Sequence, residues 1–272
     1  MGCSSLSTTP FIRALNGKAP PFVAVLTETN ACDSEHHMQK TIDTLQRVLG
    51  DQNSQNVDLI VIRVNSSNSV DAQEANIFQQ RVVSITNSIM QLKHKIYSQE
   101  EFHPFLVIVN DNIQAAFDGD ADGVHVKEYN TESIPRIRRR SMNSQQSNSS
   151  NNFIIGTSTH DIDSAIKIWR SYEPDYFFVG TCYLTSSHPE KKSLHDLEGP
   201  MLPGKVKAAL EKNIKKSSML RARLPIIFAI GGINEMNCHE PVADGVAVIK
   251  AVMGAADPES VVSRMKAKMK IG

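Results

Sequence analysis

Eight short apolar segments recur along the chain, and each is typical of a β-strand that is buried on both faces. They occupy residues 21–28, 57–64, 104–111, 123–126, 152–158, 175–180, 226–232 and 245–251. Their hydrophobic residues run without the alternation of a half-exposed strand, which indicates a parallel sheet covered on both sides. Segments with helical spacing lie between several of them, at 34–49, 72–97, 113–117 and 161–170. Eight strands alternating with helices in 272 residues predict an α/β fold, a single-domain (β/α)8 TIM barrel.

An open, doubly wound sheet is the alternative arrangement of these elements. The chain lacks the G-x-G-x-x-G turn after its first strand that opens many such sheets. The segments ADGVHV at 121–126 and ADGVAV at 243–248 are near repeats four strands apart. Repeated strand–helix units would produce such a pattern, and the barrel is therefore the preferred prediction.

The charge balance excludes several classes of partner. The chain carries 29 basic and 29 acidic residues, so no global field favours nucleic acid or an anionic membrane. Any affinity for an anion must therefore be local. The four cysteines, at positions 3, 32, 182 and 238, lack metal-type spacing, which indicates a reducing compartment. No apolar run is long enough to cross a membrane, and we expect a cytoplasmic protein.

The first residues predict a flexible N-terminal tail over 1–20, followed by the barrel at 21–272. The opening MGCSSLS places Gly2 and Cys3 where myristoyl and palmitoyl groups are attached, although Leu6 occupies the position of a Ser or Thr. The lack of acidic residues in the tail also resembles a transit peptide. An acylated or plastid form is therefore the alternative to a cytoplasmic one.

Two polar stretches interrupt the alternation of strands and helices. Residues 136–152 pass from a basic cluster into a Ser, Asn and Gln tract that is too polar to pack, which predicts a disordered insert near 141–152. Residues 212–223 form a second basic stretch. We expect both to be solvated surface, with docking of an acidic partner as the alternative.

An anion site is indicated where the last two predicted strands end. These strands end at Gly231 and Gly232, and near Ile249 and Lys250. Bare backbone N–H groups at adjacent strand ends favour an anion, and the loops after the last two strands of such barrels commonly bind phosphate. A Gly-Gly pair that only forms a tight turn is the alternative.

Seven segments, taken in order, resemble thiamine phosphate synthase and its relative, the thiazole tautomerase. They are VIRVN (61–65), LVIVNDN (106–112), ADGVHVKEYN (121–130), IIGTSTH (154–160), YFFVGTCYLTSSHPEKK (176–192), FAIGGIN (228–234) and DGVAVIKAVMGAADPES (244–260). The resemblance implies a (β/α)8 barrel that joins hydroxymethylpyrimidine diphosphate to a thiazole phosphate with Mg²⁺ and releases diphosphate. It implies small phosphorylated substrates as partners and leaves a homo-oligomer open.

The resemblance assigns one half of the site to the diphosphate. Arg63 and Ser158 would bind it as catalytic groups, Asn110 would contact a diphosphate oxygen, and Asp111 and Asn130 would hold Mg²⁺. Arginine suits bidentate binding of a phosphate, whereas asparagine is a weaker ligand than a carboxylate for a hard cation. The alternatives are that Arg63 pairs with a neighbouring carboxylate and that Asp111 caps the short helix that follows it.

Several positions depart from the family pattern, and most of these changes remove charge from the diphosphate half. Val61, Asn65 and Asn112 stand where the family has Gln, Lys and Arg, and His188 stands for a Lys. Glu128 replaces a Gln and could supply a carboxylate to the metal from a shifted position. These departures make the fold a firmer prediction than the activity.

The resemblance assigns the other half of the site to the thiazole phosphate. Its expected contacts are two hydroxyls and a backbone cradle, formed by Thr185, Ser187, Gly231, Gly232, Ile249 and Lys250. Side-chain identity matters least in such a cradle, because backbone amides make the contacts. Lys191, close by in sequence, could add a positive charge.

Three functions therefore remain open from the sequence. The first is a divergent thiamine phosphate synthase. The second is an isomerase of the tautomerase type, which needs only the phosphate cradle and a proton carrier, for which His160 is the candidate. The third is a non-catalytic barrel that keeps a phosphate ligand but has lost diphosphate chemistry. A capping role at the start of a helix is the alternative for His160.

Overall fold

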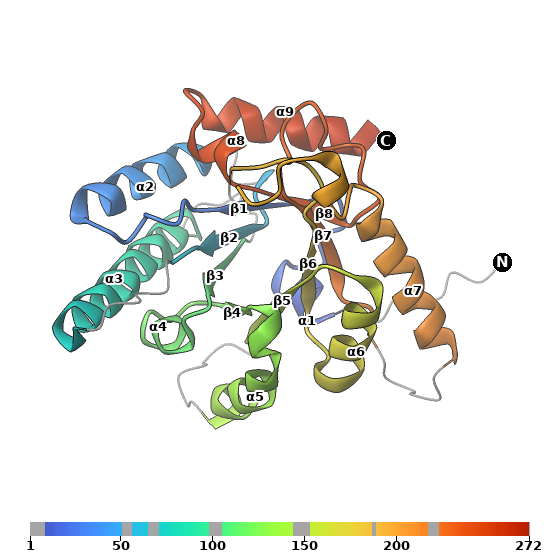
Figure 1. Ribbon diagram of the computed structural model, residues 1–272. Coiled ribbons are helices and arrows are strands. Elements are labelled where there is room, and N and C mark those ends of the chain that lie inside the picture. Colours follow the sequence, from blue (N-terminus) through green and yellow to red (C-terminus); the bar gives the residue numbers. More distant parts are fainter. Residues whose placement is uncertain are drawn as a thin grey trace.

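Eight parallel strands close into a barrel at the centre of the protein (Figure 1). The computed structural model describes residues 9–50, 56–64, 71–97, 105–143, 153–186, 189–216 and 223–271. The strands are β1 (Phe22–Leu26), β2 (Leu59–Ile62), β3 (Leu106–Asn110), β4 (Gly123–Val126), β5 (Ile154–Thr159), β6 (Tyr176–Val179), β7 (Ile226–Ile230) and β8 (Gly245–Val248). Each pairs with the next, and β8 pairs with β1. This closure confirms the predicted (β/α)8 barrel and excludes the open sheet.

Helices surround the barrel and cover its outer face (Figure 1). They are α2 (Glu35–Val48), α3 (Ala72–Tyr97), α4 (Ile113–Asp118), α5 (Ile134–Asn143), α6 (Ile162–Tyr172), α7 (Leu202–Lys216), α8 (Lys250–Met253) and α9 (Pro258–Ile271). Two 3-10 helices, Glu128–Ser133 and Leu194–Asp196, lie in the connections after β4 and β6. None of the described helices is long and apolar enough to span a membrane.

The core has two layers because successive residues of a strand face opposite sides of the barrel wall. In β1, Val23 and Val25 face the helices and belong to the large outer cluster. Phe22, Ala24 and Leu26 face the barrel interior and belong to a separate inner cluster. Both layers are apolar, which explains the continuous hydrophobic runs of the sequence.

Four aspartates repeat the same contact around the amino-terminal end of the barrel. Each directly precedes an even-numbered strand, accepts a hydrogen bond from the second backbone N–H of the preceding strand, and pairs with a basic residue on an outer helix. The sets are Asp58 with Val23 and Lys266, Asp122 with Val107 and Lys93, Asp175 with Ile155 and Arg138, and Asp244 with Ile227 and Lys207. The ADG repeat seen in the sequence is therefore half of a fourfold pattern that ties each pair of strands to a helix.

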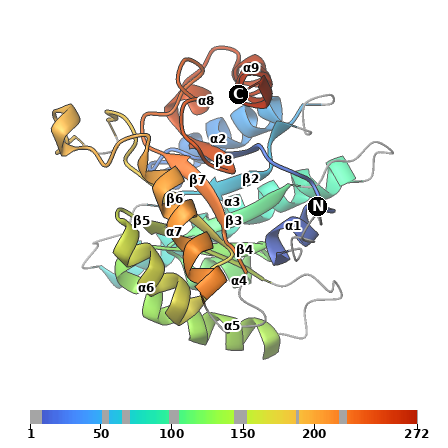
Figure 2. The ribbon, with the colours of Figure 1, turned by 90° about the vertical axis from the view of Figure 1, so that its right-hand side faces the viewer.

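The segment before β1 is not a flexible tail throughout residues 1–20. Residues 10–14 form the short helix α1 (Pro10–Ala14), and Thr9 caps it by accepting a hydrogen bond from the backbone N–H of Ile12 at 3.2 Å. Phe11 and Leu15 are completely or almost completely buried. In Figure 2, α1 lies at one end of the barrel, and the segment between β6 and α7 extends beyond the other end. The prediction is therefore wrong for residues 9–15, because an aromatic side chain anchors them.

Phe11 closes the barrel by packing against inward-facing rings of three strands. Its ring centroid lies 5.7 Å from that of Phe22, 5.8 Å from Tyr176 and 5.9 Å from Phe228, all in edge-on contacts. Such contacts are among the favourable arrangements of aromatic pairs. The first of the two barrel ends is therefore sealed, and the opposite end is left for a binding site.

The helices α5, α7 and α9 were not predicted from the sequence, and they lie in stretches rich in Lys and Arg. Each is anchored by a few buried apolar residues, such as Ile137 in α5, Leu210 in α7 and Met265 in α9. The helix boundaries also differ from expectation. α6 is capped by Asp161, not by His160, and α4 is capped by Asn112, not by Asp111.

Some predictions fall on residues that the structure does not describe. These are the acylation or transit signal in residues 1–8, most of the predicted insert at 144–152, and part of the basic stretch at 217–222. The first three residues of the predicted insert belong to the end of α5, which corrects its start. These predictions otherwise remain predictions.

Candidate active site

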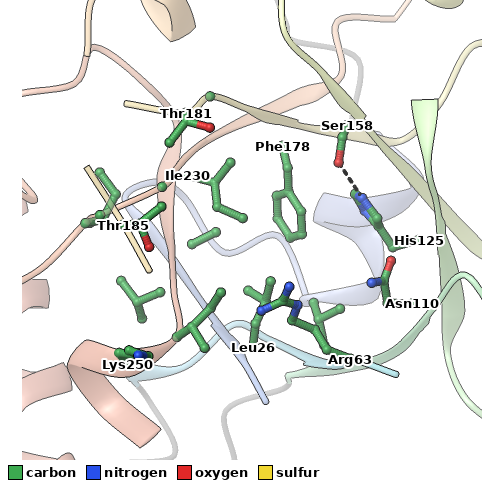
Figure 3. A pocket seen from close by; sticks show the side chains of 18 of the residues that line it. Leu26, Arg63, Asn110, His125, Ser158, Phe178, Thr181, Thr185, Ile230 and Lys250 are labelled. Carbon is green, nitrogen blue, oxygen red and sulfur yellow. Dashed lines mark hydrogen bonds between the residues drawn. The ribbon is translucent and has the colours of Figure 1, made fainter. Parts of the chain in front are cut away.

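A cavity of about 920 Å³ opens at the carboxyl ends of the strands, opposite α1 (Figure 3). Residues at the end of seven successive strands line it, namely Arg63, Asn110, Lys127, Ser158, Gly180, Gly231 and Ile249. Its apolar floor includes Leu26, Val61, Phe178 and Ile230. Parallel strands bring their carboxyl ends to the same edge, so residues far apart in sequence meet here.

Arg63 lies at one side of this cavity and has no ionic partner among the residues that the structure describes. It follows β2, where its backbone N–H donates to Thr27 Oγ1 at 2.8 Å. Burial lowers the pKa of its guanidinium, and no carboxylate among the described residues forms an ion pair with it. A partly buried charge is costly unless it is compensated. The structure therefore rules out the alternative of a neighbouring carboxylate, within the described residues, and favours an anionic ligand.

Ser158 and a histidine that the sequence analysis did not select form a hydrogen-bonded chain beside Arg63. His125 Nε2 lies 2.9 Å from Ser158 Oγ, a contact drawn in Figure 3, and His125 Nδ1 lies 3.2 Å from the Tyr176 hydroxyl. Burial, and then the charge of Arg63, lower the pKa of His125 to about 3. The ring is therefore neutral near pH 7 and orients the Ser158 hydroxyl without adding charge.

The sequence contained a signal for His125, namely a histidine within the buried strand segment GVHV. Inward-facing positions of a barrel strand are usually apolar, so a polar ring among them needs a partner. Its partners Ser158 and Tyr176 come from the next two strands, and only strand pairing brings them close.

Gly231 and Gly232 bound the opposite side of the cavity and need to be glycines. Their φ angles are 97° and 65°, in the left-handed region. A Cβ on Gly231 would lie 2.5 Å from Thr181 Cγ2, and one on Gly232 would lie 2.6 Å from the carbonyl oxygen of Leu184. Both residues are partly exposed and line the cavity, so their backbone faces the space that a phosphate would occupy.

The start of α8 lies beside the two glycines. Ile249 is its N-terminal cap residue and Lys250 its first residue, and both line the cavity. The first amides of a helix have no partner within the helix and favour an anion. Thr185, which follows β6, lines the same side, whereas Ser187 and His188 lie outside the described residues.

His160 lies at the rim of the cavity with its side chain 44% exposed. Its Nδ1 is 2.5 Å from the carbonyl oxygen of Gly180, and a carbonyl can only accept, so this nitrogen carries a proton. The other ring nitrogen is then an acceptor in the neutral form. Lys191 does not supply an uncompensated positive charge to this site, because its Nζ lies 2.5 Å from Glu198 Oε1.

The predicted metal ligands Asp111 and Asn130 do not face the cavity. Asp111 Oδ2 lies 3.0 Å from Lys127 Nζ and accepts a hydrogen bond from the Tyr129 hydroxyl at 3.3 Å. Asn130 lies within the 3-10 helix after β4, where its backbone N–H donates to the carbonyl oxygen of Lys127 at 2.9 Å. Neither residue is among those lining the cavity. In the described part of the chain, no three His, Cys, Asp or Glu residues group together as metal ligands would.

Asn110 is the one predicted diphosphate contact on β3 that faces the cavity. Its side-chain oxygen is buried and has no hydrogen-bond partner among the described residues. An unsatisfied buried acceptor is unfavourable, so a donor from a ligand would stabilise it. Lys127 lines the cavity next to Asn110 and was also missed by the sequence analysis.

Most of the predicted site residues therefore meet in one cavity. Arg63, Asn110, Ser158, His160, Thr185, Gly231, Gly232, Ile249 and Lys250 line it. Asp111 and Asn130 lie outside it, and Ser187 is not described. The fold and this site define a (β/α)8 barrel whose open mouth is lined by Arg63, which has no carboxylate partner among the described residues, and by two glycines in the left-handed conformation.

Comparison with known proteins identifies the family to which this barrel belongs. The family model described as thiamine monophosphate synthase matches residues 67–253, more than half of the chain. The chain belongs to the thiamine monophosphate synthase family. The resemblance seen in the sequence is thereby confirmed.

Individual relatives agree with this assignment. The thiamine-phosphate synthase of Methanobrevibacter smithii is 28% identical over 233 residues, which cover 78% of this chain and 98% of that protein. The thiamine-phosphate synthase of Chloroflexus aurantiacus is 29% identical over 169 residues, 61% of this chain and 65% of that protein. The match therefore spans slightly under two thirds of the Chloroflexus protein.

Two solved structures share the fold. Thiamine phosphate pyrophosphorylase from Pyrococcus furiosus superposes with a TM-score of 0.59 at 21% identity, covering 92% of this chain and 96% of that one. The 3-hexulose-6-phosphate synthase of Salmonella typhimurium gives a TM-score of 0.54 at 16% identity, covering 92% of this chain and 99% of that one. At these identities the likeness establishes the barrel alone.

Proposed function

We propose that this protein is a thiamine phosphate synthase, a transferase that joins hydroxymethylpyrimidine diphosphate to a thiazole phosphate and releases diphosphate. Membership of the thiamine monophosphate synthase family supports the proposal, because family relatives carry that name. The single observation that carries it is Arg63, a partly buried guanidinium without a carboxylate partner among the described residues, at the mouth of the cavity. A leaving diphosphate is the kind of ligand that such a group stabilises.

The cavity has two polar sides separated by an apolar floor, which suits two phosphorylated substrates. In Figure 3, Arg63, Asn110 and Ser158 lie on one side, Thr185 and Lys250 lie on the other, and Phe178 and Ile230 lie between them. We assign the first side to the diphosphate and the second to the thiazole phosphate. The apolar floor would then contact the two heterocycles and exclude water from them.

The chemistry requires charge stabilisation and no side-chain nucleophile. The bond between the pyrimidine methylene carbon and the diphosphate oxygen breaks, and its electron pair leaves with the diphosphate. The thiazole nitrogen then bonds to that carbon. Arg63 would donate to the departing oxygens, and the Ser158 hydroxyl, fixed by His125, would donate a further hydrogen bond. These donors act where negative charge develops, which lowers the barrier to ionisation.

The family resemblance implies Mg²⁺, and we tested whether the donor set suits it. Hard divalent cations prefer several oxygen ligands, with carboxylates foremost. Here Asp111 is already paired with Lys127, Asn130 offers only a neutral amide away from the cavity, and the unpartnered oxygen of Asn110 is neutral as well. As arranged, these residues do not fit a magnesium site, and the steps given above require only the side chains of the protein.

An isomerase acting on a thiazole phosphate is a second candidate, supported by one observation. The contact of His160 Nδ1 with the carbonyl oxygen of Gly180 leaves Nε2 as an acceptor at the cavity rim. That nitrogen could accept a proton from a bound thiazole. If His160 carries the proton in an isomerase reaction, His160→Gln abolishes tautomerisation. Full turnover by that variant would reject this second candidate function.

The test of the synthase proposal is turnover by the full-length chain with both substrates, detected as thiamine phosphate and diphosphate. We expect Arg63→Met to lower kcat/KM by about a hundredfold or more, since hydrogen bonds to charged groups contribute roughly 1.5–3 kcal/mol each. Arg139→Met, on the exposed surface of α5, is the matched control and should retain normal turnover. The proposal would be refuted if the folded wild-type chain formed no product at high enzyme concentration. The folded state of both variants is verified separately.

A further inference from the structure

The pair formed by Lys127 and Asp111 places a fixed cation beside the cavity where a metal ion would be expected. Lys127 follows β4 and Asp111 follows β3, and these strands are neighbours in the barrel. Lys127 Nζ lies 3.0 Å from Asp111 Oδ2, with side chains that are 35% and 14% exposed. A lysine amine is ordinarily protonated near neutral pH, and a carboxylate at this distance favours the charged form.

Asp111 is held toward Lys127 by its backbone as well as by its side chain. Its φ angle is 55°, and its N–H donates to the carbonyl oxygen of His125 at 2.8 Å. The hydroxyl of Tyr129 donates to the same carboxylate oxygen that Lys127 contacts. A divalent cation bound by Asp111 would stand next to the ammonium, and two like charges at such a distance repel strongly. The carboxylate is thus committed to the lysine.

Lys127 faces the same cavity as Arg63. Lys127, Arg63 and Asn110 line it together, and Glu128 is the only carboxylate among the lining residues that the structure describes. Lys250 adds a further positive charge on the opposite side. An anion that entered this half of the cavity would meet two cations whose charges are already in place.

We propose that Lys127 takes the electrostatic role of the divalent cation, so that the diphosphate group binds between Lys127 and Arg63 without Mg²⁺. Asp111 then serves as the residue that orients this lysine. The inference rests on the proposed function for the identity of the anion. It goes beyond that function by making diphosphate binding independent of metal.

Inorganic diphosphate is the probe for the test, and its affinity for the full-length chain is measured by calorimetry with EDTA or with excess Mg²⁺. We expect binding in EDTA that Mg²⁺ does not strengthen. Lys127→Met should weaken binding in EDTA roughly ten- to a hundredfold, the range for a hydrogen bond to a charged group. Lys167→Met, on the exposed face of α6, is the matched control and should bind as the wild type does.

The substitution Asp111→Asn distinguishes an aspartate that orients Lys127 from one that binds a metal ion, because the two roles predict different changes in diphosphate affinity. The asparagine oxygen can still accept the hydrogen bond that orients Lys127 but no longer offsets its charge, so our proposal expects binding in EDTA that is unchanged or stronger. If Asp111 is a metal ligand, the same change abolishes binding that depends on Mg²⁺. Wild-type binding that appears only with Mg²⁺, or no binding under either condition, would overturn the inference. Thermal unfolding of each variant verifies that it is folded.

Turnover distinguishes failure of this inference from failure of the proposed function. Thiamine phosphate formation that occurs only with Mg²⁺ would retain the function and reject the metal-free site. Metal-free diphosphate binding by a chain that forms no product would retain the site and reject the function.

Discussion

Ser158 Oγ and His125 Nε2 lie 2.9 Å apart on adjacent strands at the mouth of the barrel. The hydroxyl of Tyr176, a barrel-interior side chain, reaches the other nitrogen of the same imidazole at 3.2 Å. The imidazole is 3% exposed and Tyr176 is fully buried, whereas Ser158 is partly exposed and lines the cavity. This contact links the candidate catalytic serine to the barrel core, and it has a consequence for stability that can be measured.

The folded state should lose stability in acid because His125 stays neutral while the unfolded chain takes up a proton. The pKa of His125 is lowered to about 3 by burial and then by Arg63, below its ordinary value of 6.5. Between these two values the unfolded state binds more protons, so stability falls as the pH decreases through this window. At pH 5 the loss attributable to His125 is ~2 kcal/mol, and at pH 7 it is absent.

The measurement compares the free energy of unfolding of the wild type and His125→Gln across pH 4 to 8. Other titrating groups are shared, so they cancel in the difference between the two curves. We expect the difference to change by ~2 kcal/mol between pH 7 and pH 5. If the free energies of unfolding of the two proteins change with pH in parallel, the imidazole does not titrate as its burial predicts.

Gly231→Ala should be more destabilising than Gly199→Ala, although both glycines have positive φ. The φ angles are 97° and 79°, and a left-handed conformation costs a residue with a Cβ about 1–2 kcal/mol. A Cβ at position 199 meets nothing within 4 Å, so Gly199→Ala should cost only that amount. The new Cβ at position 231 would collide with Thr181, and we expect an additional loss.

Denaturant unfolding of the two variants gives this comparison directly. The Gly231→Ala variant should also bind a thiazole phosphate more weakly, whereas Gly199→Ala should bind it as the wild type does. Equal losses of stability in the two variants would mean that the close approach of Thr181 does not constrain the cradle.

Phe11→Ala should destabilise the barrel by about 3–5 kcal/mol, the usual cost of removing a buried aromatic ring. The side chain is 0% exposed and contacts the rings of Phe22, Tyr176 and Phe228. Arg13→Ala, in the same short helix but exposed, should change stability by less than about 0.5 kcal/mol. Chemical denaturation would measure the stability of both variants. A Phe11→Ala variant as stable as the wild type would indicate that residues 9–15 do not contribute to the stability of the barrel.

Lys266→Met should be far more damaging than Lys268→Met two residues later. Lys266 is 5% exposed and lies 2.7 Å from Asp58, which is 0% exposed, so its loss leaves a buried carboxylate less compensated. We expect a loss of about 3 kcal/mol, the lower end of the range for a broken buried pair, because Lys18 still contacts Asp58 at 2.6 Å.

The control pair is exposed and correspondingly weak. Lys268 is 40% exposed, and its Nζ lies 3.8 Å from Glu235 Oε1 and donates to the Glu235 carbonyl oxygen at 3.0 Å. Because this contact is exposed to solvent, its removal should cost at most about 1 kcal/mol. Thermal and urea unfolding of both variants would test the comparison. Similar losses would indicate that the fourfold aspartate contacts are not a principal support of the barrel.

The sequence was sufficient for the barrel and for most of the candidate site. Both faces of each strand are covered, so nearly every residue of a strand must be apolar. The sequence shows this requirement directly as a continuous apolar run. Gly231 and Gly232 were identifiable for a similar reason, because a left-handed turn at a strand end selects glycine locally. The helices α5, α7 and α9 were not predicted because each has only a few buried side chains among many charged ones, so its apolar pattern is weak.

The tertiary structure decided which side chains act together. Asp111 is sixteen positions from Lys127, and His125 is thirty-three from Ser158 and fifty-one from Tyr176, so no local pattern joins them. The closed barrel sets the register that brings β3 against β4 and β5 against β6. That register placed Asp111, the predicted metal ligand, within 3.0 Å of Lys127, and closure of the barrel brought Phe11 of α1 against three aromatic rings. The chain by itself determined what kind of strands would form, and closure determined which neighbours their ends would meet.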